Sequence, residues 1–158
     1  MSARIKLDPQ RFRHVLTAMY GLKSVVQRSG LPSSLVHLIK VRVSLINGCG
    51  FCIDMHTKDA RAEGETEQRL YLLGAWREAT VYSERERAAL AWADAVTVLD
   101  DQRVDEAVYE KARAAFSEDE LVALTLAIVE INGWNRFAIS FQYEAGGYVP
   151  GQFASVAV

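Results

Sequence analysis

The sequence lacks most of the features that would place it in a specialised class of protein. No stretch approaches about 18 consecutive apolar residues, so we expect no membrane-spanning helix. Residues 1–6 contain no apolar core of a secretory signal, which predicts a cytoplasmic protein. The net charge is only −2 at pH 7, and this lack of a basic excess argues against nucleic-acid binding. There is no repeat or long linker, and we expect one globular domain over residues 1–158.

Strand patterns are also missing. No alternation of apolar and polar residues persists over neighbouring runs, whereas apolar residues recur at spacings of three and four along most of the chain. We therefore predict an all-α domain of six to eight helices. The predicted starts are Asp8 with Pro9, Ser33 or Ser34, Gly48 or Cys49, Thr66, the capping box Ser83 to Glu86, Asp105, and the capping box Ser117 to Glu120.

Cysteine is scarce, and its placement is informative. The two cysteines, Cys49 and Cys52, stand three residues apart, and His56 follows four residues later. On a helix these positions share one face, which would bring two thiols and an imidazole together. A structural disulfide over so short a loop would contribute only ~2 kcal/mol, against ~4.7 kcal/mol for a 100-residue loop. Thiol redox chemistry is the better explanation of the pair.

Two local effects can activate the thiols, and they favour different sulfurs. A position at the N-terminus of a helix would stabilise a thiolate at Cys49. His56 lies one turn beyond Cys52 and can accept the proton of that residue. The residues by themselves leave open which sulfur attacks first.

A zinc site is the main alternative to redox chemistry. Cys49, Cys52 and His56 could be three ligands, with His37 or His14 as the fourth. Zinc sites usually draw on a second, separate ligand pair, which this chain lacks. His14 has Arg11 and Arg13 nearby, which is typical of a solvated surface residue. The cysteines could also be simple buried apolar residues.

Residues 35–56 contain Ile46-Asn47-Gly48 followed by Cys-x-x-Cys-x-x-x-His. This run resembles the AhpD-like alkylhydroperoxidase family of the carboxymuconolactone decarboxylase superfamily. The likeness continues through residues 59–61, 83–88 and 132–136 and spans about residues 31–139.

The resemblance implies an all-α fold that assembles as trimers or hexamers. It also implies peroxidase or disulfide reductase activity without flavin, metal or haem, with a small-molecule peroxide and a dithiol or protein thiol as partners. By the family pattern, Cys52 matches the peroxide-attacking thiol, Cys49 the resolving thiol and His56 the proton relay. Decarboxylase chemistry, as in the superfamily name, would need no dithiol.

One departure from the family pattern bears on the proton relay. The family commonly carries a glutamate twelve residues before the first cysteine, and this chain has His37 there. Many members of the branch also have a glutamine where Leu45 stands. A histidine can accept a proton near neutral pH, so His37 is a candidate catalytic residue. It cannot supply the fixed negative charge that a glutamate would place beside His56.

Overall fold

A computed structural model describes residues 3–153. Within that range the chain forms seven α-helices, two short 3₁₀ helices and no β-strand, which confirms the all-α prediction. The helices are α1 (Arg13–Gln27), α2 (Ser33–Asn47), α3 (Gly50–Ala62), α4 (Glu67–Leu72), α5 (Glu84–Val98), α6 (Glu106–Ala115) and α7 (Glu118–Ser140), and the 3₁₀ helices are η1 (Leu73–Ala75) and η2 (Asp100–Gln102).

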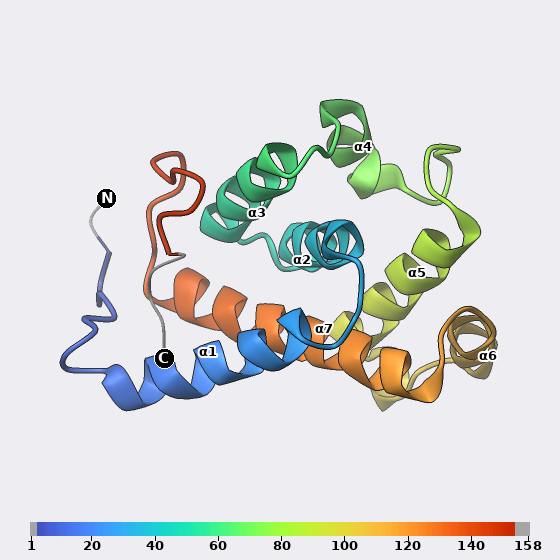
Figure 1. Ribbon diagram of the computed structural model, residues 1–158, viewed down its shortest axis with the longest axis horizontal. Helices are drawn as coiled ribbons and strands as arrows, with labels where there is room; N and C mark the ends of the chain where they lie inside the picture. Colours follow the sequence, from blue (N-terminus) through green and yellow to red (C-terminus); the bar gives the residue numbers. More distant parts are fainter. Residues whose placement is uncertain (1–2, 154–158) are drawn as a thin grey trace.

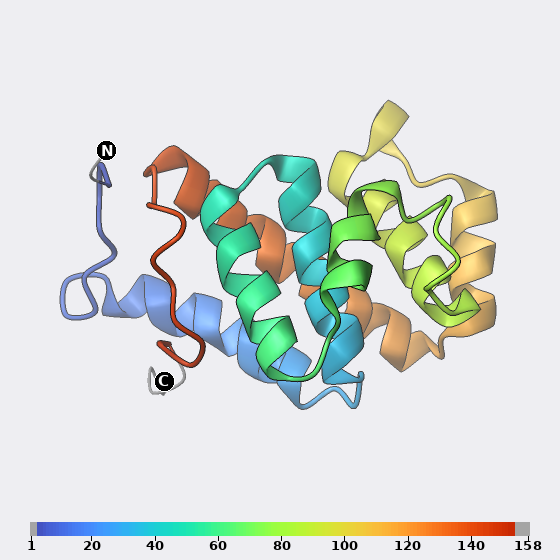
Figure 2. The same cartoon turned by 90° about the horizontal axis from the view of Figure 1, so that it is seen from above.

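Helix α2 lies at the centre of the bundle and packs against α3, α5 and α7 (Figure 1). The long helix α7 runs along the length of the molecule with α1 beside it, and Figure 2 shows α3 and α2 side by side from a second direction. The first and last described segments, before α1 and after α7, lie at the same end of the bundle. The core is formed by fully buried aliphatic side chains of these helices, including Leu38, Ile39, Leu90, Ile128 and Ile131.

Most helix starts follow the predicted capping residues. Both predicted capping boxes are present. The side chains of Ser83 and Ser117 accept the N–H of the third helical residue, Glu86 or Glu120. In return, the backbone N–H of each serine donates to the carboxylate of that glutamate. Asp105 caps α6 by accepting from Ala107. These short-range signals depend on residues two or three positions apart, so the sequence indicates them directly.

The first two helix starts differ from the prediction. The Asp8 carboxylate accepts from the N–H groups of Gln10 and Arg11, at 3.1 and 2.8 Å, and closes a turn ahead of the helix. The helix itself begins at Arg13. Neither Ser33 nor Ser34 is the cap of α2, because Ser33 is already its first residue and Pro32 holds the N-cap position without a side-chain bond.

Helix α1 is only partly buried. Only Leu16 and Val26 are buried, while Phe12, Val15, Met19 and Leu22 stay partly exposed. The helix lies at the outside of the bundle (Figure 1), and its partly exposed apolar residues form a half-covered apolar face. In the part of the chain that the structure describes, no helix is long and apolar enough to cross a bilayer.

An ion pair fastens α2 to α5. Arg42 makes two bonds to the Asp94 carboxylate, at 2.6 and 3.1 Å, and a third to the carbonyl of Leu73. Asp94 also accepts from the Trp76 indole at 3.2 Å and pairs with Arg77 at 2.7 Å. The side chains of Arg42 and Asp94 are only 14% and 12% exposed, so each is largely cut off from water.

We expect Asp94→Ala to lower the free energy of unfolding by about 3 kcal/mol, because the buried Arg42 guanidinium loses its counter-charge. Urea unfolding followed by circular dichroism measures the change. Arg77→Ala is the matched control, since it removes an exposed arm of the same network and should cost less than about 1 kcal/mol. Equal losses in the two variants would contradict the assignment.

Candidate functional site

The two cysteines lie at a tight junction between α2 and α3. Gly48 ends α2 with φ of 70°, a left-handed conformation that favours glycine. Its N–H bonds to Leu45 and the next N–H, of Cys49, bonds to Ser44 at 2.9 Å, which is a Schellman motif. Cys49 is then the N-cap of α3. The predicted placement of the Cys-x-x-Cys sequence at a helix N-terminus is thus confirmed.

Both thiols are free and buried, each with 1% of its surface exposed. The Cys49 sulfur accepts the backbone N–H of Cys52 at 3.3 Å, and a hydrogen bond also joins the two thiols. That thiol–thiol bond is the main cause that lowers the pKa of Cys49, against the opposing effect of burial. The same bond, together with burial and the charge on Cys49, raises the pKa of Cys52. Cys49 is therefore the more acidic of the two thiols and Cys52 the less acidic.

A buried amide supports the two sulfurs from α7. Asn135 is fully buried and hydrogen-bonds to both cysteine side chains. Its Nδ2 also donates to Ser44 Oγ at 3.1 Å, and its Oδ1 accepts from Asn47 at 2.8 Å. The Asn47 contact fixes the amide so that its N–H groups point toward Ser44 and the sulfurs.

Asn135 was not among the residues that the motif indicated. Its sequence signals are its place in the segment 132–136 of the family likeness and its polar side chain on the buried side of a largely apolar helix. The contact with Cys49 spans 86 residues of chain, so no local spacing indicates it.

His56 lies one turn beyond Cys52 on the same face of α3 and is buried. Burial is the main cause that lowers its pKa well below the usual value, and the positive charges of Lys40, His37 and Lys23 add to the effect. The imidazole is therefore neutral at pH 7 and can accept a proton. Neither ring nitrogen has a hydrogen-bond partner among residues 3–153.

His37 lies near the opposite end of α2 from the thiols. Its Nε2 faces the Glu63 carboxylate at 3.1 Å, and Glu63 is the C-cap of α3. Its charge acts on His56, but the ion pair that the structure gives it is with Glu63. Glu63 is a second residue that motif spacing did not indicate.

The residues suggested for zinc are not gathered at one point. In the described part of the chain, no group of three or more histidine, cysteine, aspartate or glutamate side chains could hold a metal ion. His14 is exposed on α1, as its basic neighbours predicted. The donor set thus offers no support for the zinc alternative.

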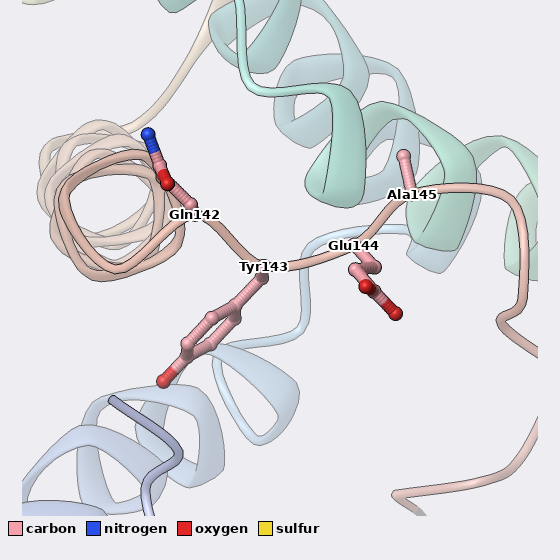
Figure 3. A pocket seen from close by; sticks show the side chains of 4 residues that line it. All are labelled: Gln142, Tyr143, Glu144 and Ala145. Carbon is pink, nitrogen blue, oxygen red and sulfur yellow. The ribbon is translucent and has the colours of Figure 1, made fainter. Parts of the chain in front are cut away.

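A small cavity of about 190 Å³ opens beside Cys49. Its walls come from the α2–α3 junction and the end of α7, and they are formed by Gly48, Cys49, Gly50, Phe51, Ala138, Ile139, Gln142, Tyr143 and Ala145. A shallower hollow of about 490 Å³ adjoins it, lined by residues 142–145 (Figure 3). Cys49 contributes to the cavity wall and Cys52 does not, so a small molecule in the cavity would meet Cys49.

The segment after α7 is fastened along α3. Asp54 accepts the N–H of Gly146 at 2.9 Å, and Lys58 donates to the carbonyl of Tyr148 at 2.9 Å. The Tyr148 hydroxyl donates to Asp59 at 2.8 Å. These bonds hold the wall of the cavity that Tyr143 and Ala145 provide.

The sequence of this chain is similar to those of known proteins. The sequence profile of the carboxymuconolactone decarboxylase family matches residues 10–95. The uncharacterised protein YdfG of Bacillus subtilis (strain 168) is 44% identical over 122 residues, covering 77% of this chain and 83% of that protein. The uncharacterised protein YnjA of Escherichia coli (strain K12) is 28% identical over 121 residues, covering 77% of this chain and 66% of that protein.

Solved structures share the fold. Protein ATU0492 of Agrobacterium tumefaciens, a protein of unknown function proposed to be the antioxidant defence protein AhpD, is 42% identical with a TM-score of 0.87. That match covers 93% of this chain and all of the other. The debrominase Bmp8, solved with 2,3,4-tribromopyrrole, is 17% identical with a TM-score of 0.75, over 87% of this chain and 74% of its own. At that identity the likeness shows the fold alone.

We expect Cys49 to stay reactive at lower pH than a free cysteine. The group with a lowered pKa keeps its thiolate until the pH falls through that lowered value. Two single-cysteine proteins test the cause: Cys52→Ser keeps a hydroxyl donor to Cys49, and Cys52→Ala removes it. Alkylation by iodoacetamide, measured against pH, should reach half its maximum at a higher pH in Cys52→Ala. Identical midpoints would show that the thiol–thiol bond does not set the charge.

Proposed function

The chain belongs to the carboxymuconolactone decarboxylase family, and we propose that it is a cofactor-free dithiol oxidoreductase that reduces organic peroxides. The observation that carries the proposal is the thiol pair itself. Cys49, the thiol with the lowered pKa, lies at a helix N-terminus and borders a cavity, and the N–H of Cys52 donates to its sulfur. The likeness to ATU0492, proposed to be an AhpD protein, supports the same function.

The first step is attack by the Cys49 thiolate on the peroxide. A new S–O bond forms as the O–O bond breaks, so sulfur is oxidised by two electrons to sulfenic acid and the peroxide is reduced. The leaving alkoxide takes a proton and departs as the alcohol. The Asn135 amide and the N–H of Cys52 stabilise the sulfur anion until attack. This order reverses the family pattern, in which Cys52 attacks.

The second step closes the disulfide. His56 accepts the proton of Cys52, and the resulting thiolate attacks the Cys49 sulfenic acid, releasing hydroxide that is protonated to water. The low basicity of His56 suits a transient acceptor, because the ring does not stay charged. An external dithiol then reduces the disulfide by exchange and returns both thiols. No flavin, haem or metal takes part in these steps.

The apolar walls of the cavity and of α1 suggest the partners. Phe51, Ala138 and Ile139 border the approach to Cys49, which favours an organic peroxide over a strongly polar one. The half-covered apolar face of α1 suits contact with further copies of the chain, as trimers or hexamers. The family's name points to decarboxylation as an alternative, but that reaction has no use for a buried dithiol. Bmp8 shows that the fold also serves a debrominase.

Addition of one equivalent of cumene hydroperoxide should remove both thiols of the reduced chain, and dithiothreitol should return them. Thiol titration with a chromogenic disulfide in denaturant measures the loss. Persistence of both thiols would refute the proposed function, and a full complement of zinc in protein purified without chelators would favour a binding role instead.

The order of attack has its own test. Dimedone traps sulfenic acid, and mass spectrometry locates the adduct. We expect Cys52→Ser to give a Cys49 adduct after peroxide treatment and Cys49→Ser to give about tenfold less adduct, because the Cys52 thiol stays protonated. Trapping confined to Cys52 would restore the family order.

A further inference from the structure

Two helices end at the small cavity, and both end in the same backbone motif. At the end of α7, the N–H of Gln142 bonds to the carbonyl of Ile139 at 3.2 Å. The N–H of Tyr143 bonds to the carbonyl of Ala138 at 2.9 Å, which completes a Schellman motif like the one around Gly48. The two motifs differ in the residue at the left-handed position, which is glycine in α2 and glutamine in α7.

A glutamine at this position costs stability. Gln142 has φ of 54°, in the left-handed region where a side chain crowds the backbone and glycine is favoured. The other described non-glycine residues with positive φ are Leu99, Asp101 and Gln102, and they lie together in the loop after α5. Gln142 is therefore the strained residue that borders the cavity. Strain of this kind is concentrated where a side chain has a function.

The side chain of Gln142 is available to a bound molecule. Gln142 lines both the small cavity and the adjoining hollow, and its amide makes no hydrogen bond within residues 3–153. Figure 3 shows the Gln142 and Tyr143 side chains on opposite sides of the segment, with the Tyr143 ring pointing toward the first part of the chain. The Tyr143 hydroxyl oxygen is buried, so it does not open into the cavity.

The rest of the cavity wall offers little to a polar ligand atom. Apart from Cys49, Gln142 and Tyr143, the residues that line the cavity have apolar side chains or none: Gly48, Gly50, Phe51, Ala138, Ile139 and Ala145. The ends of α2 and α7 add the partial negative charge of two helix C-termini. A negative charge that develops on a ligand here needs a donor, and the Gln142 amide is the side chain that can supply one.

We propose that Gln142 is a catalytic residue that binds the leaving oxygen of a small, apolar hydroperoxide. The inference rests on the proposed peroxide reduction. As the Cys49 thiolate bonds to the terminal oxygen, the O–O bond breaks and its electron pair passes to the oxygen that carries the alkyl group. The Gln142 N–H donates to this alkoxide oxygen while its charge develops. A proton from water in the adjoining hollow then gives the alcohol.

Contacts on both sides of Gln142 fix its position relative to the thiol. On one side the Schellman motif holds it to α7. On the other side Tyr143 packs edge-on against Phe51 of α3, with ring centroids 5.5 Å apart and planes at 85°. Cys49 is the N-cap of that same helix. The donor and the sulfur are thus held by one packed unit before the substrate arrives, which is what electrostatic stabilisation of a transition state requires.

The size of the cavity sets the class of substrate. Its volume of about 190 Å³ lies below the ~300–1,000 Å³ of sites for drug-sized ligands. The walls accept a short alkyl or single-ring body, and the Gln142 amide accounts for the one polar end of such a molecule.

The same substitution at two left-handed glutamines tests the role. Gln142→Gly and Gln102→Gly each relieve a positive φ, of 54° and 60°, but Gln102 does not line the cavity. We expect both variants to melt at or up to about 2 °C above the parent. The kcat/KM for tert-butyl hydroperoxide, with dithiothreitol as reductant, should fall about tenfold in Gln142→Gly and stay within about twofold of the parent in Gln102→Gly. Equal values in the two variants would overturn the inference.

The leaving group provides a second test that a structural role would not pass. Gln142→Met keeps the length of the side chain and loses the donor. Peracetic acid releases acetate, a stable anion, whereas tert-butyl hydroperoxide releases a strongly basic alkoxide. We expect Gln142→Met to lose about tenfold in kcat/KM with tert-butyl hydroperoxide and less than about twofold with peracetic acid. The same loss with both peroxides would count against the role.

Binding of a product separates this inference from the proposed function. The probe is 2-phenyl-2-propanol, the alcohol formed from cumene hydroperoxide, added to the reduced protein and followed by ¹H–¹⁵N NMR. The side-chain amide signals of Gln142 should shift and those of Gln102 should not. A parent that shows this shift but consumes no peroxide would refute the proposed function and leave the binding site standing. Unshifted Gln142 signals would overturn the inference, whatever the turnover.

Discussion

The left-handed turn at Gly48 is the constraint on which the site depends. It ends α2 and makes Cys49 the N-cap of α3. Because Cys49 lies just outside the helix, its sulfur can accept an N–H from the first turn of α3. Cys52 and His56 then follow at one-turn intervals on the inward face. A residue with a side chain at position 48 would be strained in this conformation, and a shift of the helix start would separate the sulfur from its donors. The chemistry is thus set by backbone geometry before any side chain is considered.

The same turn also governs the electrostatics. Because α2 returns antiparallel to α3, the positive groups of α2 lie along His56 and the carboxylate of Glu63 lies at the far end. The site therefore has its more acidic thiol at the cavity, a neutral imidazole in the middle and a carboxylate at the surface. Each group differs in burial, and burial with local charge sets which of them holds a proton. One antiparallel pair of helices thus holds all three groups.

Local residues predicted a large part of this structure. The capping boxes at Ser83 and Ser117, the glycine at the end of α2 and the Cys-x-x-Cys position all depend on residues within a few positions of each other, so spacing alone is informative. The predicted start of α1 was wrong because Asp8 closes a turn with its own neighbours. An aspartate accepts nearby backbone N–H groups both in such a turn and in a helix cap, so the sequence does not distinguish the two.

Sequence spacing could not indicate Asn135 or Glu63, for a different reason. Asn135 reaches the thiols across the chain from α7, and Glu63 meets His37 only because α2 and α3 pack antiparallel. Position 37 viewed alone shows a histidine where the family resemblance leads us to expect a glutamate. Viewed with its neighbour on α3, it shows a histidine and a glutamate facing each other across two helices. Two packed helices can carry a different residue at one position and keep a negative charge nearby, provided the facing helix supplies it. The loss of a family residue is then a question about the partner helix as much as about the substituted position.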